Sequence, residues 1–178
     1  SFEGQLCGAC IASPPDFDLT KAVFTYTYPI SQVLQQFKYN QQLFLAETFA
    51  ELMLHNLQAK NIDLIIPMPL HPSRLQERGF NQSLEIARSI GKHLNVAINS
   101  QAVSRIKLSP PQASLPLKER VKNMKGAFNC HEDLSGLRIA LIDDVMTTGA
   151  SLNALAKVVK AKGAAHVECW LIARTLAK

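Results

Sequence analysis

The chain has 178 residues, about the size of one domain, and its 19 Lys and Arg against 14 Asp and Glu give a formal charge of +5. Apolar residues make up 47%, which indicates a packed globular protein rather than a disordered or fibrous one. The apolar runs are far shorter than the roughly 20 residues of a membrane-spanning helix, so we expect no membrane insertion. With no signal peptide and few cysteines, a cytoplasmic location is expected.

The first residues carry a Cys-Gly-Ala-Cys pair, Cys7 and Cys10. This spacing is that of half a zinc site, whereas tetrahedral zinc takes four ligands. Because the chain starts without Met, we interpret residues 1–20 as the remnant of an N-terminal zinc module and its linker. An inert cysteine pair is the alternative. The main domain is then expected over residues 21–178.

Hydrophobic periodicity predicts alternating helices and strands in this domain. Apolar residues at spacings of three and four predict two helices between residues 29 and 60, followed by a buried strand at 62–66 and a helix at 84–94. The further predicted elements are weak strands at 102–106 and 127–130, a basic helix at 117–124, strands at 137–143 and 165–173, and a helix at 151–162. Strands separated by helices predict an α/β fold with a mainly parallel sheet flanked by helices.

Residues 71–130 carry the positive charge of the chain. They contain ten basic and three acidic residues, a net +7, which leaves −2 for all other residues. A cationic surface of this kind attracts polyanions, either a polyphosphate ligand or a nucleic-acid backbone, and charge alone does not choose between them.

The most informative motif spans residues 139–151, Ile-Ala-Leu-Ile-Asp-Asp-Val-Met-Thr-Thr-Gly-Ala-Ser. Asp143 and Asp144 are expected at the carboxyl edge of the sheet, where ligands of open α/β folds bind. In the turn that follows, Gly149 allows close backbone approach, Ser151 can cap the next helix, and the free amides suit a phosphate. We expect the carboxylates to contact sugar hydroxyls or a cation, and phosphate to contact Thr147, Thr148, Gly149, Ala150 and Ser151.

This segment resembles the thirteen-residue phosphoribosyl pyrophosphate signature of the type I phosphoribosyltransferases. The resemblance implies the type I phosphoribosyltransferase fold with a flexible hood loop. It also implies that Asp143 and Asp144 contact the ribose hydroxyls of phosphoribosyl pyrophosphate, with Mg²⁺ held by them directly or through water or the ligand, while residues 147–151 enclose the 5′-phosphate. Purine-salvage members often carry an Asp as general base where this chain has Thr147, which argues against that activity.

A second motif follows the strand predicted at 62–66. Residues 67–82 read Pro-Met-Pro-Leu-His-Pro-Ser-Arg-Leu-Gln-Glu-Arg-Gly-Phe-Asn-Gln. The prolines fix the backbone, and Arg74 and Arg78 can present forked donors to a diphosphate. The alternative is a surface helix on which the two arginines and Glu77 are solvated neighbours. We expect a surface role rather than catalysis for His71.

The second motif is similar to the hallmark of the ComF family, also called GntX-like, of competence-associated phosphoribosyltransferase-like proteins. The resemblance implies pyrophosphate contacts from Arg74 and Arg78, and closure over the reacting centre by Lys107 and Gln112. For Lys38 a purely structural role is an equally good interpretation. The match extends to the cysteine pair, Phe37-Lys38-Tyr39, Gln112, Leu115, Arg120, Asn123 and Ala127-Phe128.

Two functions fit these residues. The first is a ComF-type protein that binds phosphoribosyl pyrophosphate with Mg²⁺ and acts in natural competence, with single-stranded DNA and other DNA-uptake proteins as partners. The second is an active phosphoribosyltransferase of nucleotide metabolism or salvage, in which Asp143, Asp144, Arg74 and Arg78 are catalytic and the acceptor is unidentified. Zn²⁺ is a further cofactor only where the missing cysteine pair is present.

Three further expectations concern the tryptophan, two of the cysteines and the aromatic residues of the basic segment. Trp170 is expected in the core rather than in a base-stacking platform. Cys130 and Cys169 are expected to be ordinary buried thiols. Residues 71–130 hold only two aromatic residues, so any contact with single-stranded DNA would involve little base stacking.

Overall fold

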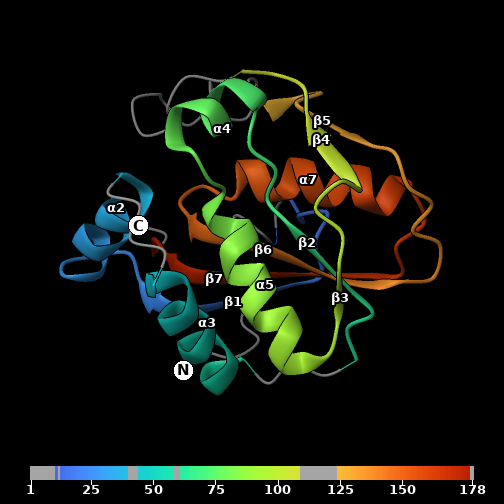
Figure 1. Cartoon of the computed structure of the whole chain (residues 1–178). Coiled ribbons are helices and arrows are strands. Elements are labelled where there is room, and N and C mark those ends of the chain that lie inside the picture. The colour runs from blue at the N-terminus through green and yellow to red at the C-terminus, as the bar shows by residue number, and fades with distance from the viewer. Residues whose placement is uncertain (1–10, 12, 40–43, 58–60, 109–123, 177–178) are drawn as a thin grey trace.

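The computed structural model describes residues 11, 13–39, 44–57, 61–108 and 124–176. Its centre is a five-stranded sheet in the order β1-β7-β6-β2-β3 (Figure 1). Every pair of neighbouring strands in this sheet is parallel. The strands are β1 (Leu19–Thr25), β2 (Leu64–Pro67), β3 (Ala97–Ile98), β6 (Arg138–Met146) and β7 (His166–Arg174).

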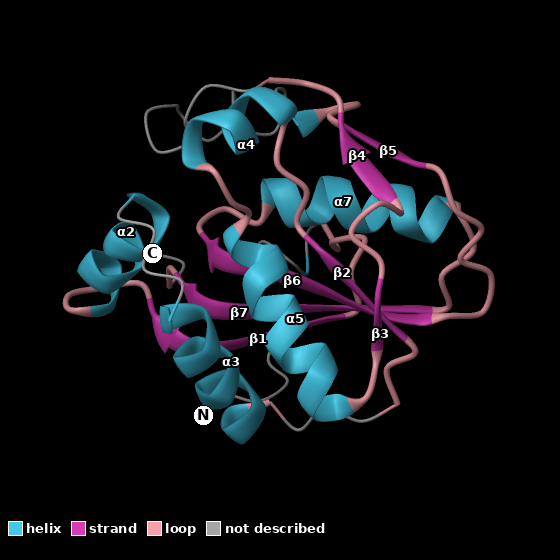
Figure 2. Cartoon of the chain, viewed as in Figure 1, coloured by secondary structure: helices cyan, strands magenta, loops and turns pink. Residues whose placement is uncertain are grey.

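Helices cover both faces of the sheet (Figure 2). One face packs against α3 (Phe44–Asn56) and α5 (Gln82–Leu94), and the other against α7 (Ala150–Ala161). Beside α7 lies a separate antiparallel pair, β4 (Val103–Arg105) with β5 (Phe128–Cys130). The short helices α2 (Ile30–Tyr39) and α4 (Pro72–Arg78) complete the described elements. The predicted α/β class, with a mainly parallel sheet flanked by helices, is therefore confirmed.

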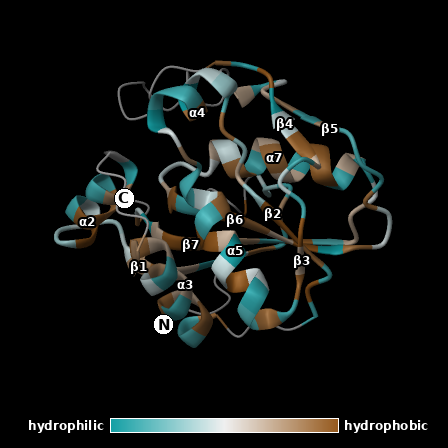
Figure 3. Cartoon of the chain, in the orientation of Figure 1, coloured by the Kyte–Doolittle hydropathy of each residue, from teal (hydrophilic) through white to brown (hydrophobic). Residues whose placement is uncertain are grey.

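Two apolar layers hold the sheet between its helices. Along β6, Ile139 and Leu141 belong to the layer under α7, whereas Ala140 and Ile142 belong to the layer under α3 and α5. A strand buried on both faces has no polar side, so its sequence is apolar throughout. Figure 3 shows this hydrophobic character along β6 and β7. Trp170 is fully buried in the second layer, as predicted.

Most predicted elements are present, with differences at four places. β1 and the two-residue β3 were not predicted, and the second motif contains helix α4, which was expected only as the alternative interpretation of that motif. β6 continues past its predicted end at Asp143 to Met146, because β7 pairs with it along that whole length. The expected zinc pair, the hood loop around Gln112 and all of the predicted helix at 117–124 except Met124 lie outside the described residues.

The connections place a topological switch between β2 and β6. After β2 the chain passes through α4 and α5 to β3 on one side of the sheet, and after β6 it passes through α7 to β7 on the other. β2 pairs with β6 only as far as Ile142, so beyond the end of β2 the strand β6 is paired with β7 alone. Such a switch is where open α/β sheets form a crevice at their carboxyl edge. Asp143 is the first residue of β6 beyond β2.

No helix among the described residues has the length and apolar character needed to cross a membrane.

Candidate functional site

Two adjacent carboxylates form the centre of the site. Asp143 Oδ1 accepts hydrogen bonds from Ser83 Oγ at 3.1 Å and from the Asp144 amide at 2.9 Å. Asp144 is almost completely buried, and its Oδ2 lies 2.7 Å from the ammonium nitrogen of Lys38. The carboxylates of β6 are therefore held from two sides, by α5 through Ser83 and by α2 through Lys38.

The surroundings of this pair shift two pKa values. Burial and, second, the negative charge of Asp144 raise the pKa of Asp143 from 3.8 to about 7. Burial disfavours the Lys38 ammonium, but the adjacent Asp144 carboxylate outweighs it and raises the pKa of Lys38 above its usual value. Lys38 is therefore a permanent cation beside the carboxylates.

Asn81 and Gln82, which end the second motif, brace this arrangement together with Ser83. Asn81 caps α5 by accepting from the amides of Ser83 and Leu84, and its Nδ2 donates to Met68 O at 3.0 Å. Gln82 is 2% exposed, and its Nε2 donates to Lys38 O at 3.3 Å. These residues thus connect the loop after β2 with α2 and the carboxylate pair.

The arginines of the second motif lie on helix α4. His71 caps this helix by accepting from the Ser73 amide at 3.2 Å, which gives it a local structural role. Arg74 pairs with Glu77 at 2.6 Å, as the surface-helix alternative expected. Arg78 is partly buried, donates to Gln82 Oε1 at 3.2 Å, and its positive charge acts on the Lys38 ammonium. Arg78 therefore faces the site more directly than Arg74.

The predicted phosphate turn lies at the start of α7. Gly149 is the N-cap residue and has φ +76°, a backbone conformation that residues with a Cβ rarely adopt. The turn surrounds a hollow of about 30 Å³ that is also lined by Asp143. Thr175 Oγ1 donates to Thr147 O at 2.8 Å and fixes the turn to the end of β7. A helix N-terminus of this kind suits a phosphate.

The predicted capping role of Ser151 is wrong. Its hydroxyl donates to the sulfur of Met124 at 3.4 Å, and the N-cap residue of α7 is Gly149, which has no side chain to cap the helix. The reason is that the left-handed conformation of Gly149 starts the helix at Ala150, which places Ser151 inside the first turn. Thr148 Oγ1 instead accepts from the Ala150 amide at 3.4 Å.

Arg105 is a functional candidate that our sequence reasoning missed. Its guanidinium lies over the ring of Phe128, 5.6 Å from the centroid, and its Nε is buried without a hydrogen-bond partner. The charges of Asp143, Arg74 and Arg78 all act on this guanidinium, while burial lowers its pKa from the usual value. No sequence signal could have found it, because its position opposite the buried Phe128 follows from the pairing of β4 with β5. Two elements, α4 and β4, thus bring three arginines near the carboxylates.

Lys107, which the resemblance expects to close over the reacting centre, contacts the backbone beside the β4–β5 pair in this structure. Its ammonium donates to Lys125 O at 2.6 Å, next to a backbone hydrogen bond of 2.9 Å from Ile106 N to Ala127 O. Both contacts tie the two ends of the predicted hood loop together. Gln112, the other residue expected to close, lies outside the described residues.

The type I resemblance implies Mg²⁺, and the donor set at the carboxylate pair fits it in one way. Mg²⁺ in proteins is commonly held by one or two carboxylates together with waters and phosphate oxygens of the substrate. Asp143 and Asp144 supply two carboxylates, and the described residues contain no cluster of three or more His, Cys, Asp or Glu that could hold a metal. The pair therefore fits Mg²⁺ that is also bound by ligand oxygens.

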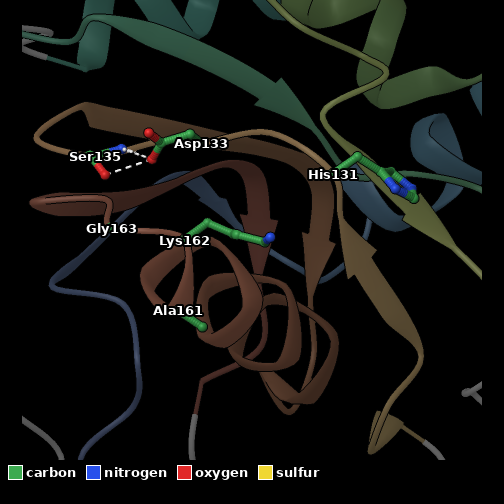
Figure 4. A pocket seen from close by; sticks show the side chains of 6 residues that line it. All are labelled: His131, Asp133, Ser135, Ala161, Lys162 and Gly163. Carbon is green, nitrogen blue, oxygen red and sulfur yellow. Dashed lines mark hydrogen bonds between the residues drawn. The ribbon is translucent and has the colours of Figure 1, made fainter.

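A larger depression of about 530 Å³ lies at the other end of α7 (Figure 4). Its acidic group, Asp133, already accepts hydrogen bonds from the amide and hydroxyl of Ser135 at 3.0 and 2.6 Å. None of the predicted site residues lies there, and the residues that line it are His131, Asp133, Ser135, Ala161, Lys162 and Gly163.

Comparison with known proteins found close relatives, although no family model matches the chain. The DNA utilization protein YhgH of Salmonella typhi is 33% identical over 177 residues, which cover 96% of this chain and 78% of the relative. Competence protein F of Haemophilus influenzae is 31% identical, over 97% of this chain and 80% of its own length. Among solved structures, the purine phosphoribosyltransferase of Pyrococcus horikoshii matches 79% of this chain and 80% of its own, at 19% identity and a TM-score of 0.45.

Proposed function

The chain belongs to the ComF family of competence-associated, phosphoribosyltransferase-like proteins, and from this premise we propose that it binds phosphoribosyl pyrophosphate together with Mg²⁺ at the carboxyl edge of its sheet. The observation that carries the proposal is the carboxylate pair at the strand switch, followed within a few residues by the uncapped N-terminus of α7. This arrangement offers acceptors for sugar hydroxyls and amides for a phosphate on one edge.

Each part of the ligand has a matching group in this proposal. Asp143 and Asp144 accept from the ribose hydroxyls, and the turn at residues 147–151 receives the 5′-phosphate. Arg78 and Arg105 supply charge-assisted hydrogen bonds to the diphosphate. The buried, unpartnered Nε of Arg105 supports this assignment, because a buried donor without an acceptor is costly unless a ligand satisfies it.

The same groups would stabilise charge on departing pyrophosphate, which is the requirement for phosphoribosyl transfer. Guanidinium groups that are already in place cost no reorganisation when that charge develops. Mg²⁺, when bound, would supply further neutralisation of the diphosphate. Binding is thus the core of the proposal, and transfer to an acceptor is the additional step that an assay must find.

Calorimetric titration with phosphoribosyl pyrophosphate, with and without Mg²⁺, tests the binding. We expect saturable binding that the double variant Asp143→Asn, Asp144→Asn loses, whereas the matched control Asp133→Asn keeps it. Asp133 is an exposed carboxylate at the other end of α7, so its loss leaves the site intact. Equal affinity in wild type and double variant would refute the site. Release of pyrophosphate with candidate acceptors would then identify a transferase.

We further propose a role in natural competence or DNA use, located in the cytoplasm. The names of the relatives support the first part, and the free, buried thiols of Cys130 and Cys169 fit a reducing compartment. Direct contact with single-stranded DNA is less favoured, because Arg74 and Arg88 are paired with glutamates. A salt titration tests such contact: a steep loss of DNA affinity supports it, and a flat curve counts against it.

A further inference from the structure

Lys38 is held rigidly at the carboxylate pair. Its neighbour Phe37 is fully buried and packs against the rings of Phe49 and Phe80, with centroids 5.7 and 6.0 Å away. The carbonyl oxygen of Lys38 accepts the hydrogen bond from Gln82 Nε2. These contacts fix the end of α2 beside the carboxylate pair. Its ammonium then lies 2.7 Å from Asp144 Oδ2.

This ammonium lies beside the oxygens that a metal ion at the carboxylate pair would use. Asp144 Oδ2 forms an ion pair with Lys38, and Asp143 Oδ1 accepts hydrogen bonds from Ser83 and a backbone amide. A divalent ion that approached the pair would compete with these contacts for the oxygens and would meet a fixed positive charge. The Lys38 and Asp144 side chains are only 24% and 9% exposed, so water screens the charges at this position weakly. The repulsion between the Lys38 ammonium and an approaching metal ion is therefore strong.

We propose that Lys38 is a built-in counter-cation that keeps free divalent metal ions off Asp143 and Asp144, so that Mg²⁺ enters only together with the ligand. The second half of this inference rests on the proposed function. A diphosphate brings negative charges and further oxygen ligands, and these offset the repulsion from Lys38. Lys38 is therefore a positioning residue that makes metal binding conditional on the ligand.

A titration of the ligand-free protein with Mn²⁺ tests whether Lys38 excludes metal ions from the carboxylate pair. The electron paramagnetic resonance signal of the free ion measures how much Mn²⁺ is bound. We expect wild type and Lys38→Arg to leave Mn²⁺ free. Lys38→Met keeps the apolar stem without the charge and should bind one Mn²⁺ at least about tenfold more tightly. Adding Asp143→Asn and Asp144→Asn to Lys38→Met should abolish that gain, which places the ion at the pair.

Two results would overturn the inference. The first is tight Mn²⁺ binding by wild type that the two Asp→Asn changes remove, and this result does not depend on the folding of any Lys38 variant. The second is a Lys38→Met protein with wild-type circular dichroism and no gain in Mn²⁺ affinity. Because the experiment contains no phosphoribosyl pyrophosphate, its outcome is separate from that of the calorimetric titration. Loss of ligand binding alone would refute the proposed function and leave metal exclusion standing.

Discussion

Replacing Asp143 by Asn should stabilise the fold while removing a group of the proposed site. Burial and the negative charge of Asp144 beside it destabilise the ionised form of Asp143. Asn has nearly the same shape, and its amide oxygen can still accept from Ser83 Oγ and the Asp144 amide. The substitution thus removes the charge and leaves the hydrogen bonds that hold the side chain.

The size of the effect follows from the pKa of Asp143, which rises from 3.8 to about 7 on folding. At 1.36 kcal/mol per pKa unit, this corresponds to about 4 kcal/mol. The native state binds the proton more tightly than the unfolded state, so wild-type stability falls as pH rises between these two values. The Asn variant lacks this loss. The difference in free energy of unfolding between the Asn variant and wild type should be near zero at about pH 4, grow with pH, and level off above about pH 7.

Urea unfolding of wild type and variant between about pH 5 and about pH 8 measures this difference. Asp133→Asn is the matched control. Hydrogen bonds from Ser135 lower the pKa of exposed Asp133, so its loss should remove stability above the unfolded-state pKa rather than add it. An Asp143→Asn protein that is less stable than wild type at pH 8, or whose advantage does not depend on pH, would refute the reasoning.

Three further substitutions test other parts of the structure. Gly149→Ala should lower the free energy of unfolding by about 1–2 kcal/mol, since φ is +76°, and should weaken ligand binding; an unchanged melting temperature would contradict this. Arg105→Met should cost roughly tenfold or more in affinity for phosphoribosyl pyrophosphate with little loss of stability, because Nε has no hydrogen-bond partner among the described residues; wild-type affinity in calorimetry would remove Arg105 from the site. Trp170→Phe should destabilise by about 1–3 kcal/mol, because it deletes the 2.7 Å hydrogen bond to buried Glu168; denaturant unfolding checks this, and equal midpoints would be the contrary result.

The sequence could predict the part of the site that is contiguous along the chain. Asp143, Asp144 and the turn at residues 147–151 follow one apolar strand, and the local pattern alone indicates a carboxylate pair beside a helix start. Lys38 and Arg105 come from α2 and β4, far from β6 along the chain. Only tertiary packing brings them to the carboxylates, so no local pattern assigns their partners.

The unpredicted elements have physical reasons of their own. β1 lies at the edge of the sheet, and its partly exposed residues do not show the apolar run of a buried strand. α4 carries helix signals, with Pro72 at its start and Gly79 just past its end, and the surface-helix alternative for this motif agrees with them. Tertiary context therefore decided β1, whereas local signals indicate α4.

The position of β1 has a consequence for how the chain folds. The first described strand pairs with the last, and the hydrogen bond from Val167 N to Asp18 Oδ2 spans 149 positions. Contacts this distant in sequence raise the contact order and slow folding, because a long loop must close before they form. β1 can therefore pair with β7 only after the residues up to 174 have been synthesised. Because α2 follows β1 directly, Lys38 should reach Asp144 among the last events of folding.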